Sequence, residues 1–313
     1  MDRRRTARRT LTAAALALLL GGAGTNVTIP IREARWLPPD RLLDALSREP
    51  AECLSWPADP AARKSVAIGR IAFRAPLLLG GQAARAGLSC ASCHRNGRGN
   101  PDFLFPTLSG APGTADVTSS LMSSRRGDQI ANPRPIPDLG GPRASLKVPH
   151  ATPGTLETFI HGLVVEEFDG PEPPAQVLAG LAAYVRGTRP EACRGSGHPI
   201  RLVDHLQQVD QAVALARESE AGTRQLMLAA ARSTLGAIDE RFQRPGLESQ
   251  RALLLRADRQ LQAIRIDAAD FSAWGRSWPS IRTALLRAAS RSLYDRKQLQ
   301  QAVNAAYPSS RAQ

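Results

Sequence analysis

The stretch "GLSCASCHRNGRGN", residues 87–100, places Cys90, Cys93 and His94 within five consecutive residues. Residues three apart lie on the same side of a helical turn, so a helix here would present both thiols on one face. The imidazole of His94 would lie about a hundred degrees further round that turn. The other two cysteines of the chain stand far apart in the sequence and form no second pair.

Two thiols followed directly by an imidazole predict covalent attachment of a haem, because the C-x-x-C-H spacing lets both thiols bond its vinyl groups while the histidine ligates iron. We therefore expect Cys90 and Cys93 to hold one haem c per chain, with His94 as the proximal iron ligand. Two alternatives compete with this interpretation. A thioredoxin-type pair needs alternating strands and helices, which the pattern does not show, and a structural zinc site needs four ligands.

The N-terminus predicts export. "MDRRRTARRT" is basic, "LTAAALALLL" is a ten-residue apolar run, and "GGAG" supplies small residues for cleavage. Residues 1–24 are therefore expected to be a signal peptide, while a retained anchor is the less favoured alternative because the run is short for a membrane span. Haem attachment to C-x-x-C-H takes place outside the cytoplasm, so both signals predict a periplasmic protein.

Export also bears on Cys53 and Cys193, which bracket the haem motif. A disulfide between them would persist in an oxidising compartment. Closing a loop of this length stabilises a fold by roughly 4 kcal/mol in the chain-entropy model. The alternative is a pair of free, buried thiols.

The charge of the chain is basic, and part of it belongs to the signal segment. The formal charge is +13, and loss of residues 1–24, with five arginines and one aspartate, leaves about +9. The mature chain has no long basic run and no interleaving of aromatic and basic residues, so nucleic-acid binding is not expected. A basic surface would suit an acidic periplasmic redox partner.

The chain divides near residues 186–199 into two predicted parts. A lead-in over 25–63 and a loop-rich haem domain over 64–195 come first. A long loop in a compact domain usually serves a function or wraps around something. Residues 199–308 then read as a helical bundle, because apolar residues recur at three- and four-residue spacing. Its expected helices lie within 202–218, 226–242, 247–264 and, after Pro279, 280–303. The predicted fold class is all-α, and the bundle is a candidate surface for a protein partner.

Segment 64–189 resembles a c-type cytochrome domain of the bacterial dihaem cytochrome c peroxidase kind. "IGRIAFRAPLLLGGQAARAGLSCASCH" is similar to the entry of those domains, and "LKVP" and "FIHG" are similar to later segments. The resemblance implies that a helix with Gly69 and Phe73 crosses a closing helix with Leu181 and Tyr184. It also implies that "FPTLSG", residues 105–110, matches the proline-leucine-glycine segment that follows the haem motif.

By that resemblance the carbonyl of Pro106 would accept a hydrogen bond from Nδ1 of His94, which would orient the imidazole. The chain departs from the peroxidases in one respect. They carry two haem motifs in two similar domains, whereas this chain has one motif and an unrelated second half.

The distal side of the iron has several candidates. Met122 lies in the long loop, His161 lies about twenty residues before the closing helix, and His150 stands among prolines. An axial methionine or histidine suits electron transfer, and an open position suits binding of a small molecule. We expect Met122 or His161 as the distal ligand, with His150 and an open site as alternatives.

Three acidic residues follow His161 in "VVEEFDGPEP": Glu166, Glu167 and Asp169. They are either a solvated helix end or a source of an acid–base carboxylate for peroxide. The sequence thus predicts an exported monohaem c-type cytochrome that transfers electrons. There are two alternatives. One is an oxidoreductase of the peroxidase or oxidase kind that acts at a five-coordinate haem, and the other is a haem-based sensor or scaffold.

Overall fold

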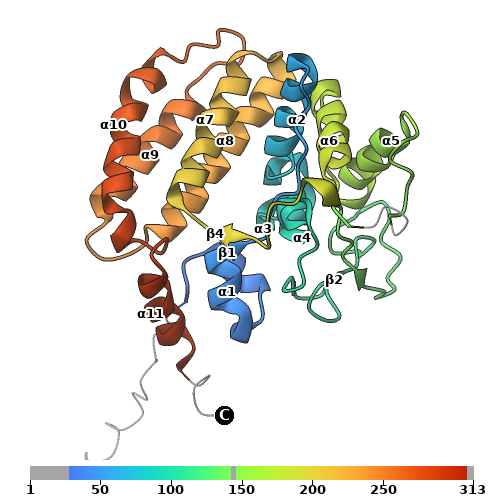
Figure 1. Ribbon diagram of the computed structural model, residues 1–313, viewed down its shortest axis with the longest axis horizontal. Coiled ribbons are helices and arrows are strands. Elements are labelled where there is room, and N and C mark those ends of the chain that lie inside the picture. Colours follow the sequence, from blue (N-terminus) through green and yellow to red (C-terminus); the bar gives the residue numbers. More distant parts are fainter. Residues whose placement is uncertain (1–27, 142–145, 309–313) are drawn as a thin grey trace, which may run out of the picture.

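The computed structural model describes residues 28–141 and 146–308, so the predicted signal peptide lies outside the described residues. The described chain is mostly helical, which confirms the predicted all-α class (Figure 1). Its α-helices are α1 (Leu42–Ser47), α2 (Pro60–Ala72), α3 (Gly81–Ala86), α4 (Cys90–Cys93), α5 (Thr155–Gly162), α6 (Ala175–Gly187), α7 (Leu202–Arg217), α8 (Ala221–Arg241), α9 (Glu248–Gln262), α10 (Ser272–Ala288) and α11 (Arg296–Ala306). A π-helical turn, Leu163–Glu167, continues α5.

Four short strands form two antiparallel pairs. β1 (Arg48–Glu49) pairs with β4 (His198–Pro199), which ties the lead-in segment to the chain just before the bundle. β2 (Thr114–Ala115) pairs with β3 (Arg134–Pro135) inside the long loop after the motif. The loop is therefore folded back on itself beside α4 (Figure 1).

Helices α2 and α6 cross at two glycines. A β-carbon on Gly69 would come within 1.8 Å of the carbonyl oxygen of Gly180, so the two backbones touch at this point. Next to the crossing, the rings of Phe73 and Tyr184 lie 5.0 Å apart between centroids, and Leu181 is buried. The predicted pairing of these two helices is therefore present in the structure.

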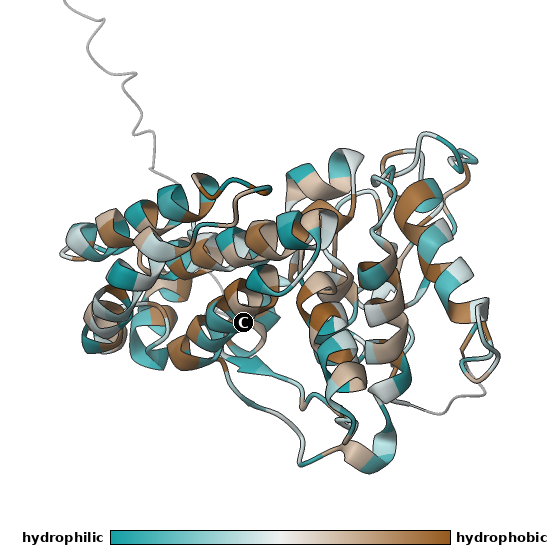
Figure 2. Ribbon diagram, turned by 90° about the horizontal axis from the view of Figure 1, so that it is seen from above, coloured by the Kyte–Doolittle hydropathy of each residue, from teal (hydrophilic) through white to brown (hydrophobic). Residues whose placement is uncertain are grey.

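Helices α2 and α6 form one layer, and helices α7 to α10 form a second layer beside it. In the second layer α7 packs on α8, α8 on α9 and α9 on α10. Along these helices hydrophobic and hydrophilic residues alternate in short bands, as expected of helices with one buried face (Figure 2). The residues of the predicted apolar faces are buried: Leu202, Leu206, Val209 and Val213 on α7, and Leu226, Ala230, Leu235 and Ile238 on α8.

The last predicted helix, 280–303, does not match the structure at its start or at its end. Helix α10 begins at Ser272 and runs through Pro279. Trp274 and Trp278 stack 4.5 Å apart between centroids on its buried side. Burial of two indoles offsets the backbone hydrogen bond that proline cannot donate.

The segment 280–303 is also two helices and not one. Helix α10 ends at Ala288, and α11 begins at Arg296. The carboxylate of Asp295 accepts hydrogen bonds from the backbone N–H groups of Lys297 and Gln298. An aspartate in this N-cap position starts a new helix.

The two predicted parts share one hydrophobic core among the described residues, which runs from the lead-in through α2 and α6 into the bundle. Helix α2 packs on α7 and α8 as well as on α6. The predicted boundary at residue 64 falls inside α2, because Pro60 occupies its first turn and Asp59 caps it. The lead-in is thus part of the folded unit.

A disulfide joins Cys53 in the lead-in to Cys193 just after α6. The backbone beside it is paired as well, since the N–H of Arg189 donates to the carbonyl of Cys53 at 2.7 Å. The bond encloses the motif helix and the whole long loop within one covalent ring.

We expect Cys53 and Cys193 to resist alkylation in the unfolded, unreduced protein, because both sulfurs are bonded. Replacing both by serine should lower the free energy of unfolding by roughly 2 to 5 kcal/mol, since the crosslink restricts the unfolded chain. Thiol labelling followed by mass spectrometry, with and without reductant, checks the first outcome, and urea unfolding checks the second. Labelling of both residues without reductant would contradict the pairing.

Candidate functional site

The motif cysteines lie on α4, a single helical turn. Ser89 and Ser92 form a capping box at its start, each side chain bonding the backbone N–H of the other. The N–H of Ala91 donates to the carbonyl of Phe73 at 3.0 Å, which fastens the turn to the end of α2. Both thiols are free and are not bonded to each other. The local fold therefore presents two neighbouring thiols on a fixed turn.

Burial sets the protonation of these thiols. Desolvation raises the pKa of Cys90 and of Cys93 to about 12. Redox cysteine pairs and zinc ligands act as thiolates and have lowered pKa values. Among the described residues no three His, Cys, Asp or Glu side chains meet as a metal-binding group. The surroundings of the pair do not favour thiolate chemistry, and two neutral thiols fit sulfurs that end as thioethers.

The imidazole of His94 is held by one nitrogen. Its Nδ1 lies 3.0 Å from the carbonyl oxygen of Pro137. A carbonyl can only accept, so Nδ1 carries the proton. Desolvation lowers the pKa of His94 to about 4, so the ring is neutral at physiological pH. In the described part of the chain Nε2 makes no hydrogen bond. This is the nitrogen through which the imidazole would bind iron.

The expected role of Pro106 is wrong in this structure. Its carbonyl accepts a hydrogen bond from the hydroxyl of Thr107 at 2.5 Å, within a local turn. Pro137 takes the position beside His94. The stretch "PDLGG", residues 137–141, also contains proline, leucine and glycine in order. Two such stretches therefore follow the motif, and the folding of the long loop brings the second one to the histidine.

Arg98 holds the Pro137 segment in place, and sequence reasoning missed it. Its Nε and Nη2 donate to the carboxylate of Asp138 at 2.6 to 2.8 Å. Its Nη1 lies 3.0 Å from the sulfur of Cys53 and 3.4 Å from that of Cys193. One side chain therefore connects the chain after the motif, the disulfide and the segment that orients His94.

A buried polar network supports the turn after His94. The hydroxyl of Tyr184 donates to Glu52 at 2.9 Å, and Arg74 donates to Glu52 and to Asn96, both at 2.7 Å. Asn96 adopts a left-handed backbone conformation, with φ of 51°. Although desolvation opposes ionisation, Arg74 and Arg70 lower the pKa of Glu52 to about 2. The network therefore remains charged and fixed at neutral pH.

The distal candidates lie in different environments. Met122 is 1% exposed within the core. His161 faces outward, with its side chain 36% exposed and Nε2 at 2.8 Å from the carboxylate of Glu172. The carbonyl of His150 accepts from Nε of Arg186 at 2.9 Å. The structure thus buries the methionine and pairs His161 with a surface carboxylate.

The acidic residues after His161 fasten the Met122 loop. Glu166 forms an ion pair with Arg126, and Asp169 accepts from the N–H and hydroxyl of Ser124 at 2.8 to 3.0 Å. Glu167 also lies near Arg126, with its Oε1 3.7 Å from Nη1 of that arginine. Glu167 is 9% exposed, and its Oε2 has no hydrogen-bond partner among the described residues. Desolvation raises the pKa of Glu167, so its proton is held more tightly than that of an ordinary glutamate.

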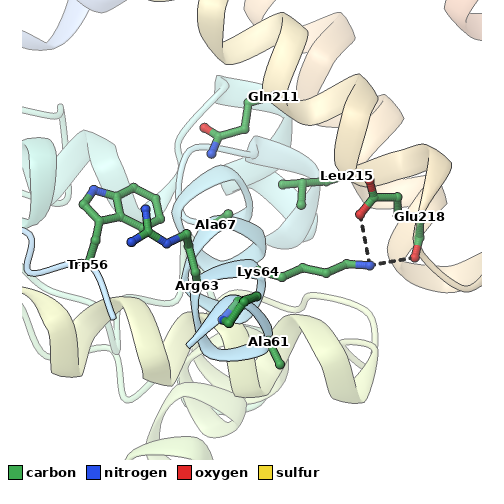
Figure 3. A pocket seen from close by; sticks show the side chains of 9 residues that line it. Trp56, Ala61, Arg63, Lys64, Ala67, Gln211, Leu215 and Glu218 are labelled. Atoms are coloured by element: carbon green, nitrogen blue, oxygen red, sulfur yellow. Dashed lines mark hydrogen bonds and ion pairs between the residues drawn. The ribbon is translucent and has the colours of Figure 1, made fainter. Parts of the chain in front are cut away.

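A surface groove of about 700 Å³ lies between α2 and α7, and it involves no residue of the motif. Lys64 reaches across it, with Nζ 2.9 Å from the carbonyl and 3.3 Å from the carboxylate of Glu218 (Figure 3). Trp56 lies beside Arg63 at its rim (Figure 3). The groove belongs to the contact between these helices and is separate from the site around His94.

No family model, curated protein or solved structure matches the chain. Over the ranges that the structure describes, every helix is too short or too polar to cross a membrane.

Proposed function

We propose that the protein is an exported monohaem c-type cytochrome that carries electrons in the periplasm. The observation that supports this most is the geometry of the motif: two half-buried, neutral thiols lie on one turn, next to an imidazole whose Nδ1 is held by Pro137. Cys90 and Cys93 would bond the haem, and His94 would ligate its iron through Nε2. When bound, the haem supplies a one-electron redox centre.

The surroundings support this role. Cys90, Ala91 and Cys93 of the motif helix pack against the hydrophobic core, and the ring of Phe73 lies 6.4 Å from that of His94 between centroids. A carbonyl on Nδ1 fixes the ring and increases the basicity of the other nitrogen. The chain's own residues thus orient the ligand and provide an apolar surface beside the motif.

The proposal is tested on the chain exported by a host with haem-attachment machinery. Haem should remain with the protein after denaturing electrophoresis and after acidified acetone extraction. A pyridine haemochrome spectrum should show one haem for each chain. A colourless, fully exported and folded protein would overturn the proposal.

We propose Met122 as the distal ligand, because it is buried whereas His161 is paired with Glu172 at the surface. The oxidised protein should then show a weak sulfur-to-iron absorption band at the red end of the spectrum. Met122→Ala should remove the band, lower the reduction potential and admit cyanide. His161→Ala is the matched control and should leave all three unchanged. Loss of ligation in the histidine variant alone would reverse the assignment.

A peroxidase that acts at a five-coordinate haem is the second candidate, and Glu167 is the observation that favours it. Its buried Oε2 lacks a hydrogen-bond partner, and desolvation raises the pKa of Glu167, which favours the protonated form. If the wild-type iron is high-spin and peroxide is turned over with an artificial electron donor, Glu167→Gln should reduce the rate by about a hundredfold, the size of a general acid–base contribution. Glu166→Gln, which changes the exposed neighbour, should leave the rate within twofold. Equal rates in both variants would exclude this role.

A further inference from the structure

Two stretches of the chain lie against each other beside the imidazole of His94. Residues 94–99 follow the motif helix, and residues 136–141 belong to the long loop. The Nδ1 of His94 lies 3.0 Å from the carbonyl oxygen of Pro137. A β-carbon on Gly99 would come within 3.3 Å of the carbonyl oxygen of the residue before Pro137, so the two backbones lie close together there as well. The position of the Pro137 carbonyl therefore depends on how these two stretches are held together.

One ion pair joins the two stretches. Nε of Arg98 donates to the two carboxylate oxygens of Asp138 at 2.7 and 2.8 Å, and Nη2 donates to one of them at 2.6 Å. A guanidinium fork on a carboxylate fixes direction as well as distance. Because Asp138 follows Pro137 directly, a carboxylate held by Arg98 also limits the movement of the carbonyl that faces His94.

Arg98 is anchored on its other side as well. Its Nη1 lies 3.0 Å from the sulfur of Cys53 and 3.4 Å from that of Cys193, and these two sulfurs form the disulfide. The carboxylate of Asp138 also accepts from the backbone N–H of Gly140 at 2.9 Å. The arginine therefore connects the disulfide on one side to the turn that follows Pro137 on the other.

The tautomer of His94 decides whether its imidazole can bind a metal through Nε2. A neutral histidine carries its proton on Nδ1 or on Nε2, and only the Nδ1–H form leaves the lone pair of Nε2 free. The carbonyl of Pro137 next to Nδ1 selects that form. Such a hydrogen bond also makes the imidazole a stronger electron donor. A stronger donor favours the more highly charged, oxidised iron and so lowers the reduction potential.

We propose that Arg98 is a positioning residue for the iron ligand. It holds Asp138 and thereby keeps the Pro137 carbonyl at Nδ1 of His94, which sets the tautomer of this histidine and lowers the reduction potential of the iron. The effect on the potential rests on the proposed function, whereas the effect on the tautomer concerns the chain alone. Arg98 acts through other residues in this role and need not touch the iron.

The test removes the ion pair by Arg98→Met together with Asp138→Asn, which keeps the net charge. Arg232→Met together with Asp258→Asn is the matched control, because this pair between α8 and α9 has a similar fork and side chains 36% and 28% exposed, against 28% and 34%. In the haem-free full chain, nitrogen-15 NMR of labelled histidine should show the Nδ1–H tautomer of His94 in the wild type and in the control. The Arg98–Asp138 variant should show a mixture with the Nε2–H form. His94→Gln identifies the signal.

The haem-bound protein gives the second readout, and the Arg98–Asp138 variant should have a higher reduction potential than the wild type. Partners that orient a metal ligand contribute at least about tenfold to metal affinity. A tenfold loss in the preference for oxidised iron equals about 59 mV for one electron. The control should keep the wild-type potential. Cyanide binding should be unchanged in both variants, which would show that the distal side is intact.

Arg98→Lys is a second variant for the case that the first one does not fold. It keeps the charge, but a lysine cannot form the fork, so both readouts should shift in the same direction. A wild-type tautomer in these variants would overturn the positioning role. A changed tautomer with an unchanged potential would overturn the effect on the iron. If haem attaches to no chain, the wild type included, the proposed function fails, and the tautomer still decides the role of Arg98.

Discussion

A chain that carries Cys90→Ala together with Cys93→Ala is expected to lose all covalent haem, with no haem stain left on a denaturing gel. The two thiols are the free cysteines of the described chain. They lie one helical turn apart beside an imidazole that Pro137 orients. Without both sulfurs no thioether can form, so any haem held by His94 alone would dissociate on denaturation.

The matched control is Cys53→Ala together with Cys193→Ala, which removes the same number of cysteines from the disulfide. It should lower stability but keep the stain, because thioether bonds survive unfolding. Each single motif variant should retain one attachment point and shift the haemochrome band. Full staining of the double motif variant, or its loss in the disulfide variant alone, would contradict the proposed attachment.

Gly69→Leu is expected to destabilise the fold strongly, with a loss of about 3 kcal/mol or more in the free energy of unfolding. A β-carbon at this position would lie 1.8 Å from the carbonyl oxygen of Gly180 and 2.6 Å from the backbone nitrogen of Leu181. Neither backbone atom can move aside as a side chain could. Helices α2 and α6 would have to separate, which would break the contact between Phe73 and Tyr184.

Gly236→Leu on α8 provides the control. A β-carbon there meets nothing within 4 Å, and the position is exposed. Replacing a glycine inside a helix by a good helix former should stabilise the protein by about 0.5 to 1 kcal/mol. Urea unfolding followed by far-ultraviolet circular dichroism measures both variants. A Gly69→Leu protein within about 0.5 kcal/mol of the wild type would show that the crossing tolerates a side chain.

Separation of these helices should also disturb the candidate haem site. Arg74, one residue beyond Phe73, connects Glu52 to Asn96 in the turn after His94, and Tyr184 donates to the same Glu52. Moving α2 from α6 would pull this network apart. A partly folded Gly69→Leu protein is therefore expected to attach haem less completely than the Gly236→Leu control.

Local pattern was sufficient for features that depend on residues close in the chain. Spacing alone put Cys90 and Cys93 on one turn, and apolar periodicity found the buried faces of α7 and α8. Helix boundaries were less predictable. A proline normally ends a helix. At Pro279 the burial of Trp274 and Trp278 against neighbouring helices outweighs that preference.

Long-range packing determined the rest of the candidate site. Pro106 and Pro137 are equivalent in local sequence, and the β2–β3 pairing together with the Arg98–Asp138 ion pair bring only Pro137 to His94. Sequence spacing likewise did not distinguish Met122 from His161 as the distal iron ligand. Their different exposure depends on which segments cover them, and these segments are distant in the sequence.

The sequence by itself thus determined the helical class, the turn that carries two thiols and an imidazole, and the residues able to form a close helix crossing. These depend on periodicity and on the size of single side chains. Only the tertiary structure decided which carbonyl holds the imidazole, which candidate distal ligand is buried, and which carboxylate oxygen is left without a hydrogen-bond partner. Burial and charge compensation depend on which residues are neighbours in space. Rules that consider only residues close together in the sequence cannot predict them.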